Sequence, residues 1–120
     1  MKKSWIIISI FFFLSFSLYA EEVRVYNWSD YIDQSVIDQF EESTGIKVIY
    51  DVFDSNEVLE GKLLAGSTGY DIVSPSIEYL GRQVKAGIHL ELDKTALPNF
   101  NNLDPIMMEM LSSMDPENKY

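Results

Sequence analysis

The sequence predicts an α/β fold with a mainly parallel sheet. Short apolar runs with strand-like alternation recur along the chain, and segments with helical spacing separate them. Glycine, proline or a capping residue stands at most of the changes from one to the other. This order is typical of βαβ units, whose right-handed crossovers place the helices against the faces of the sheet.

The first twenty residues resemble a secretory signal peptide. A basic start is followed by an apolar run and by Ala20, and the run is shorter than the ~20 residues that a membrane span needs. We expect cleavage after Ala20, which leaves a mature chain of residues 21–120. An uncleaved N-terminal anchor is the alternative, because Leu18 is bulkier than the residue usual two positions before the cleavage site.

The mature chain would be strongly acidic and free of cysteine. It keeps seven basic and nineteen acidic residues, a net charge of −12. Such a surface repels phosphate backbones, which argues against nucleic-acid binding, and it favours cationic ligands. Plain solubility explains the same charge. Without cysteine there is neither a disulfide framework nor a lipid-bearing cysteine after the apolar run, so the fold must rest on its core.

The first half of the mature chain contains two expected strands and the helix between them. Residues 23–28 predict a short buried strand. A helix follows, with Asp33 as its N-cap and Gly45 at its left-handed C-terminal position. In residues 46–53 the side chains of Ile46, Val48, Tyr50 and Val52 fall on one side, which predicts the second strand.

The pattern continues with a second helix over residues 57–65. A third strand is expected over residues 70–74, ended by Pro75. Ser76 is placed to cap a third helix, which Gly87 closes.

The last part of the chain predicts one more strand and one more helix. Residues 88–93 alternate in the manner of a fourth strand. Asp104 and Pro105 form an N-cap followed by proline at the first helical position. A methionine-rich helix should run from there to about Met114, with its methionines used in packing against the core or another lobe.

Three loops should lie together beyond the sheet. Ligands of open α/β sheets bind outside the carboxyl ends of the strands. Residues 28–31, 54–57 and 74–76 follow the first three expected strands, so we expect one crevice lined by aromatic rings, carboxylates and hydroxyl groups. For residues 54–56 helix capping is the favoured interpretation from the sequence alone.

The first of these loops carries the chemistry of an ammonium site. Trp28 and Tyr31 can cover the methylene groups of a ligand and attract its ammonium group, at ~0.5–2 kcal/mol each. Asp30 can accept charge-assisted hydrogen bonds from that ammonium. The residues alone leave a plainer alternative open, in which Trp28 is a core residue and Ser29 and Asp30 form a turn or a helix cap.

Other chemistries find less support in the sequence. The glycine-rich residues 66–69 follow a helix and precede a strand, which is the wrong order for a phosphate loop. Residues 54–65 lack the glycine and the final glutamate of a calcium loop. The one histidine, His89, has no histidine or cysteine partner for a transition metal. We therefore expect no catalytic residue, no metal and no cofactor.

Three stretches of the sequence resemble one known family. They are "YNWSDYI", "FEESTGIKVIYDVFDSNEVLEGKLLAGSTGYDIVSPS" and "LDKTALPNFNNLDP". Together they are similar to the periplasmic polyamine-binding proteins of bacterial ABC importers, with the putrescine receptors as the most similar members. The resemblance covers residues 23–120. It implies a two-lobed venus-flytrap α/β fold, of which residues 21–120 would form the first part of the N-terminal lobe.

The resemblance also implies a function and a site. It implies periplasmic binding of putrescine, with spermidine as a second ligand, and delivery to the membrane permease of an ABC transporter without any catalysis. The family motif that lines the amine site matches Trp28, Ser29, Asp30 and Tyr31. A Val-Pro-Ser motif after the third strand supplies another ligand contact in the family, and its serine corresponds to Ser76.

Two positions depart from the family pattern. Ser74 stands where valine is usual, a mild change of packing. Glu78 stands where relatives carry serine or tyrosine near the ligand, with Tyr79 beside it, so we include both in the expected site. Glu78 could contact an ammonium group and alter selectivity among polyamines, or it could face solvent in the first turn of a helix, where an acid is favourable.

The length of the chain is the largest departure, because family members are much longer. The opposite lobe supplies the remaining ligand contacts in the family, so we expect residues 21–120 alone to bind polyamines weakly or not at all. A receptor for another cationic organic solute and a truncated remnant without function remain as alternatives. An exported enzyme is disfavoured, since no nucleophile–base or metal constellation is present in the sequence.

Overall fold

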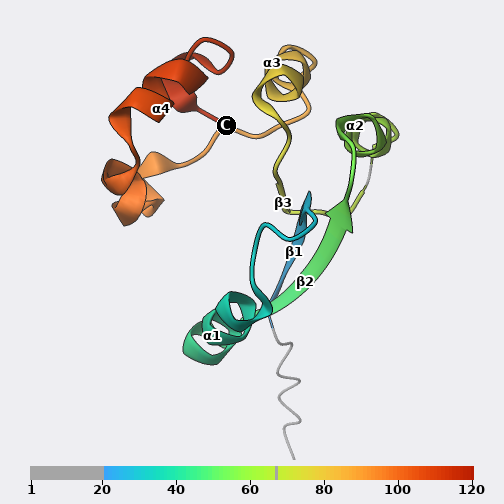
Figure 1. The fold of residues 1–120 in the computed structure, drawn as a ribbon, viewed down its shortest axis with the longest axis vertical. Coiled ribbons are helices and arrows are strands. Elements are labelled where there is room, and N and C mark those ends of the chain that lie inside the picture. Colours follow the sequence, from blue (N-terminus) through green and yellow to red (C-terminus); the bar gives the residue numbers. More distant parts are fainter. Residues whose placement is uncertain (1–20, 67) are drawn as a thin grey trace, which may run out of the picture.

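The computed structural model describes residues 21–66 and 68–120, so the expected signal peptide lies outside the described residues. It confirms an α/β fold with a parallel sheet of three strands (Figure 1). The central strand is β1 (Glu22–Trp28), with β2 (Lys47–Phe53) on one side and β3 (Ile72–Val73) on the other.

The crossovers run through two helices, and the register of the sheet sets where each strand ends. Helix α1 (Gln34–Thr44) joins β1 to β2, and α2 (Asn56–Leu64) joins β2 to β3. Trp28 pairs with Phe53 at the end of the β1–β2 ladder. The carboxyl ends of β1 and β2 therefore place two aromatic side chains side by side at one edge of the sheet.

Local chemistry fixes the ends of these helices as predicted. The Asp33 carboxylate accepts a hydrogen bond from the Ser35 amide at 2.8 Å and caps α1. Gly45 follows α1 with a φ of 73°, which a residue without a side chain adopts readily. Ser55 caps α2 by accepting from the Val58 amide at 3.2 Å.

The remainder of the chain is helical and irregular. Helix α3 (Ile77–Lys85) follows β3, and α4 (Pro105–Leu111) begins after Asp104, whose carboxylate accepts from the Ile106 amide at 2.8 Å. Helix α4 ends before the predicted Met114. Three 3₁₀ turns complete the described chain at Lys94–Ala96, Pro98–Asn102 and Pro116–Asn118.

The predicted fourth strand over residues 88–93 is wrong. This stretch is irregular, the Leu92 amide donates to the Lys119 carbonyl at 2.7 Å, and the Leu90 side chain is 90% exposed. Alternating apolar residues form a strand only where a neighbouring strand satisfies their backbone groups. No strand of the described chain lies alongside these residues. The third strand is also shorter than the predicted residues 70–74.

The core lies between the sheet and α2. Tyr26, Phe53 and Leu59 are its buried residues, and Leu59 has no exposed surface. Half-buried side chains pack against these three: Trp28, Leu63, Tyr70 and Val73. The Tyr26 ring stacks on that of Tyr70, with centroids 4.6 Å apart, so the loop before β3 is held against the sheet.

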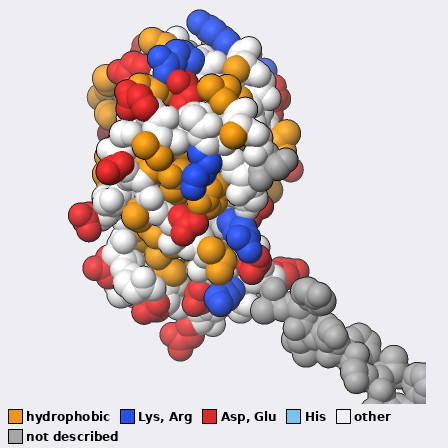
Figure 2. All heavy atoms as spheres, turned by 90° about the vertical axis from the view of Figure 1, so that its right-hand side faces the viewer, with side chains coloured by type: hydrophobic (Ala, Val, Ile, Leu, Met, Phe, Trp, Pro, Cys, Tyr) orange, Lys and Arg blue, Asp and Glu red, His pale blue; other side chains and the backbone are white. Residues whose placement is uncertain are grey.

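Apolar surface remains open elsewhere. On α1 only Ile37 is buried, whereas Val36 and Phe40 line an open apolar hollow of about 230 Å³ against the sheet. Leu64, Ile72, Ile106 and Met110 are more than half exposed. Figure 2 shows apolar side chains between scattered acidic and basic groups on one face of the molecule. Among the methionines, Met114 packs beside Gly81 of α3, whereas Met107 and Met110 are more than half exposed.

Candidate functional site

The end of β1 places Trp28 between the core and solvent. Its ring lies against that of Phe53, with centroids 4.6 Å apart, and its other neighbour is Tyr31, with centroids 6.2 Å apart and an angle of 33° between the planes. Trp28 is half-buried, whereas Tyr31 is 70% exposed. The two interpretations of Trp28 are therefore compatible, because one face can pack while the rest of the ring stays available to a ligand.

A turn after β1 carries Asp30, the acidic residue between Trp28 and Tyr31 in the sequence. The Ser29 amide donates to the Phe53 carbonyl at 3.3 Å, which ties the turn to the end of β2. Asp30 adopts a left-handed backbone with φ 61°, a conformation that aspartate and asparagine tolerate better than most residues. Asp30 is exposed, so its carboxylate is accessible to a cation.

Asn56 and Ser76 connect the other two loops of this edge. The Ser76 amide donates to Asn56 Oδ1 at 3.0 Å, and Asn56 Nδ2 donates to Ser76 Oγ at 2.9 Å. Asn56 is the first residue of α2, and Ser76 directly precedes α3. The loops after β2 and β3 are thus joined as the topology predicted.

Tyr79 and Glu78 occupy different environments in the first turn of α3. The Tyr79 hydroxyl donates to Glu57 Oε1 at 2.5 Å, and the Arg82 guanidinium lies 4.1 Å from the centre of the Tyr79 ring. The hydrogen bond to Glu57 raises the pKa of Tyr79, and the same contact lowers the pKa of Glu57. Glu78 is exposed and has no ion-pair partner in residues 21–66 and 68–120.

The structure therefore brings most of the predicted site residues to the carboxyl edge of the sheet. These residues differ in how far their side chains are already engaged by neighbouring groups. Trp28 and Tyr31 lie together, Ser29 is tied to β2, and Ser76 is joined to α2. The Tyr79 hydroxyl is already engaged by a neighbouring helix. Arg82, the basic residue beside Tyr79, is paired with Glu60 at 2.7 Å.

Two contributors to this edge were not predicted as site residues. Phe53 supports the Trp28 ring, and the only sequence signal for it is its position at the end of the alternating strand. Asn56 was interpreted as a helix cap, but Ser55 has that role and the Asn56 side chain faces Ser76. A contact across twenty residues leaves no periodic signal in the sequence.

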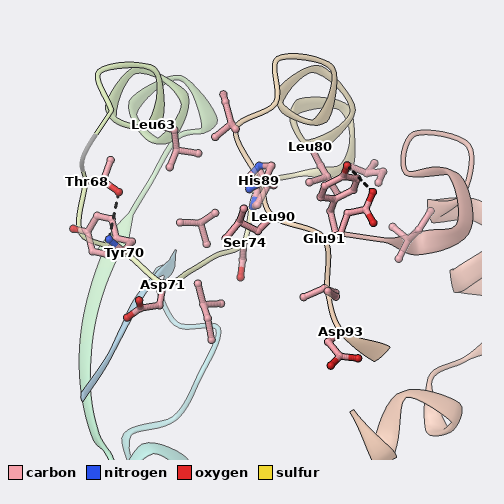
Figure 3. Close-up of a pocket in the computed structure, with 18 of the residues that line it drawn as sticks. Leu63, Thr68, Tyr70, Asp71, Ser74, Leu80, His89, Leu90, Glu91 and Asp93 are labelled. Carbon is pink, nitrogen blue, oxygen red and sulfur yellow. Dashed lines mark hydrogen bonds between the residues drawn. The ribbon is translucent and has the colours of Figure 1, made fainter. Parts of the chain in front are cut away.

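A groove of about 800 Å³ lies beside β3. Figure 3 shows its walls, formed by side chains around β3 and by residues 88–93. Ser74 lines it, whereas none of the seven predicted site residues does. The groove adjoins the loop after β3, because Pro75 and Ile77 on either side of Ser76 line it, whereas Trp28 and Tyr31 do not.

His89 lines this groove, and we expect it to give the stability of the fold a pH dependence. Its Nε2 lies 2.8 Å from Gln83 Oε1, and burial lowers its pKa from the ordinary 6.5. The unfolded chain therefore takes up a proton at a higher pH than the folded one. We expect the free energy of unfolding to be greatest above pH 6.5 and to fall as the pH drops from there towards the lowered pKa.

Urea midpoints at pH 7.5 and at about 5.5 measure this effect, with His89→Gln as the matched variant. Glutamine keeps a polar side chain but does not titrate, so the variant should lose less stability between the two pH values than the original chain. Equal losses in both proteins would show that His89 contributes nothing to the acid response.

Two further kinds of site find no support in the described chain. Within residues 21–66 and 68–120, no three histidine, cysteine, aspartate or glutamate side chains are grouped to hold a metal ion. In the same residues no helix has both the length and the apolar character that crossing a membrane requires.

Sequence comparison identifies relatives of the chain. The putrescine-binding periplasmic protein PotF of Escherichia coli is 55% identical over 106 residues, which are 87% of this chain and 29% of the relative. SpuD of Pseudomonas aeruginosa, also a putrescine-binding periplasmic protein, is 54% identical over 98 residues, covering 82% of this chain and 27% of its own length. The chain is similar to part of each of these putrescine-binding periplasmic proteins. No family model matches it.

Solved structures of similar proteins agree with the fold. A spermidine/putrescine ABC transporter protein of Listeria monocytogenes superposes with a TM-score of 0.79 at 44% identity, over 83% of this chain and 30% of the other. The spermidine/putrescine substrate-binding protein PotD of Streptococcus pneumoniae gives a TM-score of 0.77 at 39% identity, with the same coverage. The chain spans less than a third of the length of these polyamine-binding relatives.

Proposed function

We propose that this protein binds polyamines, putrescine foremost and spermidine second, in the periplasm and delivers them to the permease of an ABC importer. The observation that carries the proposal is the accessible Trp28–Tyr31 pair with an exposed Asp30 between them, at the carboxyl edge of a parallel sheet. The 55% identity to a putrescine-binding periplasmic protein supports it. Binding of another cationic organic solute is the alternative that the same chemistry allows.

The proposed site matches the chemistry of a diamine, which has an ammonium group at each end of a methylene chain. Rings such as those of Trp28 and Tyr31 cover a methylene chain and attract an ammonium group. Asp30 accepts hydrogen bonds from that ammonium, and Ser76 Oγ offers an additional acceptor. Because a polyamine carries only donors at its ends, a site made of acceptors and aromatic faces selects it over anions and neutral chains.

We further propose that residues 21–120 form part of the N-terminal lobe of a two-lobed receptor. The coverage of the relatives supports this, since the matched region is about 29% of their length. The open apolar hollow between α1 and the sheet and the exposed Leu90 offer surface on which further protein can pack. No catalytic residue is proposed, since the relatives are named as binding and transport proteins.

Calorimetric titration of the protein at its natural length tests the proposal. We expect saturable binding of putrescine and none of 1,4-butanediol, which has the same carbon chain without the ammonium groups. Asp30→Asn should weaken putrescine binding about tenfold, through loss of a charge-assisted hydrogen bond. Asparagine tolerates the left-handed backbone of Asp30, so the fold should be preserved. Equal affinity for the diamine and the diol would refute the proposal.

Glu78 provides a separate prediction about selectivity. Its exposed carboxylate stands two residues after Ser76 at the start of α3. Glu78→Ser should disfavour spermidine, with three ammonium groups, more than putrescine, with two, and change their affinity ratio about two- to fivefold, the worth of an exposed ion pair. Glu78→Gln is the control for charge and should act like serine. An unchanged affinity ratio in both variants would show that the Glu78 carboxylate faces solvent and does not alter selectivity.

A further inference from the structure

We propose that Asn56 is a positioning residue of the polyamine site, which holds Ser76 in place for the ligand. The proposal rests on the polyamine-binding function proposed above. It assigns to Asn56 a role that acts through another residue, because both Oδ1 and Nδ2 of its side chain are directed at Ser76.

The geometry of this pair fixes which atom faces which. The Ser76 backbone amide is a donor only, so the Asn56 atom at 3.0 Å from it must be the carbonyl oxygen Oδ1. Nδ2 then faces Ser76 Oγ at 2.9 Å and donates to it. Both contacts are partly buried, which shields them from competition with water.

Ser76 is free to make this contact because it does not cap its own helix with its side chain. It occupies the N-cap position of α3, yet its hydroxyl makes no capping hydrogen bond. Ser55, at the equivalent position of α2, does cap by accepting from Val58. The Ser76 hydroxyl is thus turned toward Asn56. Helix α3 therefore lacks the stabilisation that a capping side chain usually provides.

The two hydrogen bonds between Asn56 and Ser76, called the Asn56–Ser76 tether below, link two loops at the carboxyl ends of the strands. In the strand order β2-β1-β3, the two strands that precede Asn56 and Ser76 are not neighbours, because β1 lies between them. The side chain of Asn56 therefore joins the loops on either side of the end of β1, where Trp28 stands. Loss of the tether should release the third loop from the rest of the site.

The same contact sets the polarity of the Ser76 hydroxyl. A hydroxyl oxygen has two lone pairs, and Asn56 Nδ2 takes one of them. The other lone pair is the one that a ligand ammonium, which can only donate, can use. Asn56 thus fixes both where the acceptor of Ser76 stands and in which direction it is available.

Two substitutions at Asn56 and one control test the proposal in the protein at its natural length. Asn56→Ala should weaken putrescine binding about tenfold, as expected for two lost hydrogen bonds. Asn56→Asp should stay within about threefold of the original, because a carboxylate can accept from both the Ser76 amide and its hydroxyl. Ser55→Ala removes the neighbouring helix cap and should lower stability without changing putrescine affinity.

Hydrogen exchange of the Ser76 amide without ligand provides a readout that does not depend on binding. It should accelerate in Asn56→Ala and stay protected in Ser55→Ala. If exchange accelerates while putrescine affinity is unchanged, Asn56 is structural only and the proposal is overturned, as it is if exchange does not respond. Absence of polyamine binding in the unaltered protein would instead overturn the proposed function, and this proposal with it.

Discussion

Trp28→Ala is expected to weaken putrescine binding about 30- to 150-fold, corresponding to about 2–3 kcal/mol from the lost cation–π attraction and the lost apolar cover of the ligand chain. The substitution removes the ring that lies between Phe53 and Tyr31. It should also destabilise the fold, because the half-buried ring packs on the core. Calorimetry of the variant at its natural length, together with a urea denaturation curve, separates the two effects.

Trp28→Phe is the matched control for this prediction. Phenylalanine can keep the contact with Phe53 and offers a weaker ring to the ammonium, so its affinity should lie between those of tryptophan and alanine. If Trp28→Ala is destabilised but binds putrescine as tightly as the original protein, then Trp28 is a core residue alone and the proposed site is misplaced.

Leu59→Ala should produce the largest loss of stability, about 2–5 kcal/mol in the free energy of unfolding. Leu59 has no exposed surface and packs with Tyr26 and Phe53 between α2 and the sheet. Truncation leaves a cavity at the only place where the helix and the two longest strands share a buried core within the described residues. A small sheet has few other buried contacts with which to compensate.

Leu64→Ala on the same helix is the control, because the Leu64 side chain is 65% exposed. It should change the free energy of unfolding by no more than about 0.5 kcal/mol, the usual range for a surface substitution. Urea midpoints of the two variants measure the difference. Similar midpoints for both would show that the core between α2 and the sheet is not where stability resides.

Local chemistry was sufficient to predict the N-terminal ends of α1, α2 and α4, but the predicted capping by Ser76 and the predicted end of α4 near Met114 were wrong. Asp33, Ser55 and Asp104 each accept hydrogen bonds from amides in the first turn that follows them, as short polar residues before a helix do. The two long strands were predictable because their alternation is satisfied by direct pairing. The strand predicted over residues 88–93 was wrong because these residues alternate but have no neighbouring strand in the described chain with which to pair.

The arrangement of the loops that carry the candidate site was predictable in part, and ligand binding by these residues stays a prediction. The rule that ligands lie beyond the carboxyl ends of parallel strands located Trp28, Asp30 and Ser76 at one edge. The Asn56–Ser76 tether could not be predicted, because either side chain could have capped its own helix. The same applies to Tyr79, whose contact with Glu57 depends on how α3 docks against α2.

Nuclear magnetic resonance of the Trp28 indole during a putrescine titration tests the central claim most directly. Trp28→Phe identifies the indole Nε1–H signal in the protein at its natural length, and 1,4-butanediol serves as the uncharged control. The account predicts a saturable shift of the Trp28 indole and of the Ser76 amide with putrescine, and no shift with the diol. Shifts confined to His89 and Leu90 in the groove beside β3, with the Trp28 signal unmoved, would contradict it.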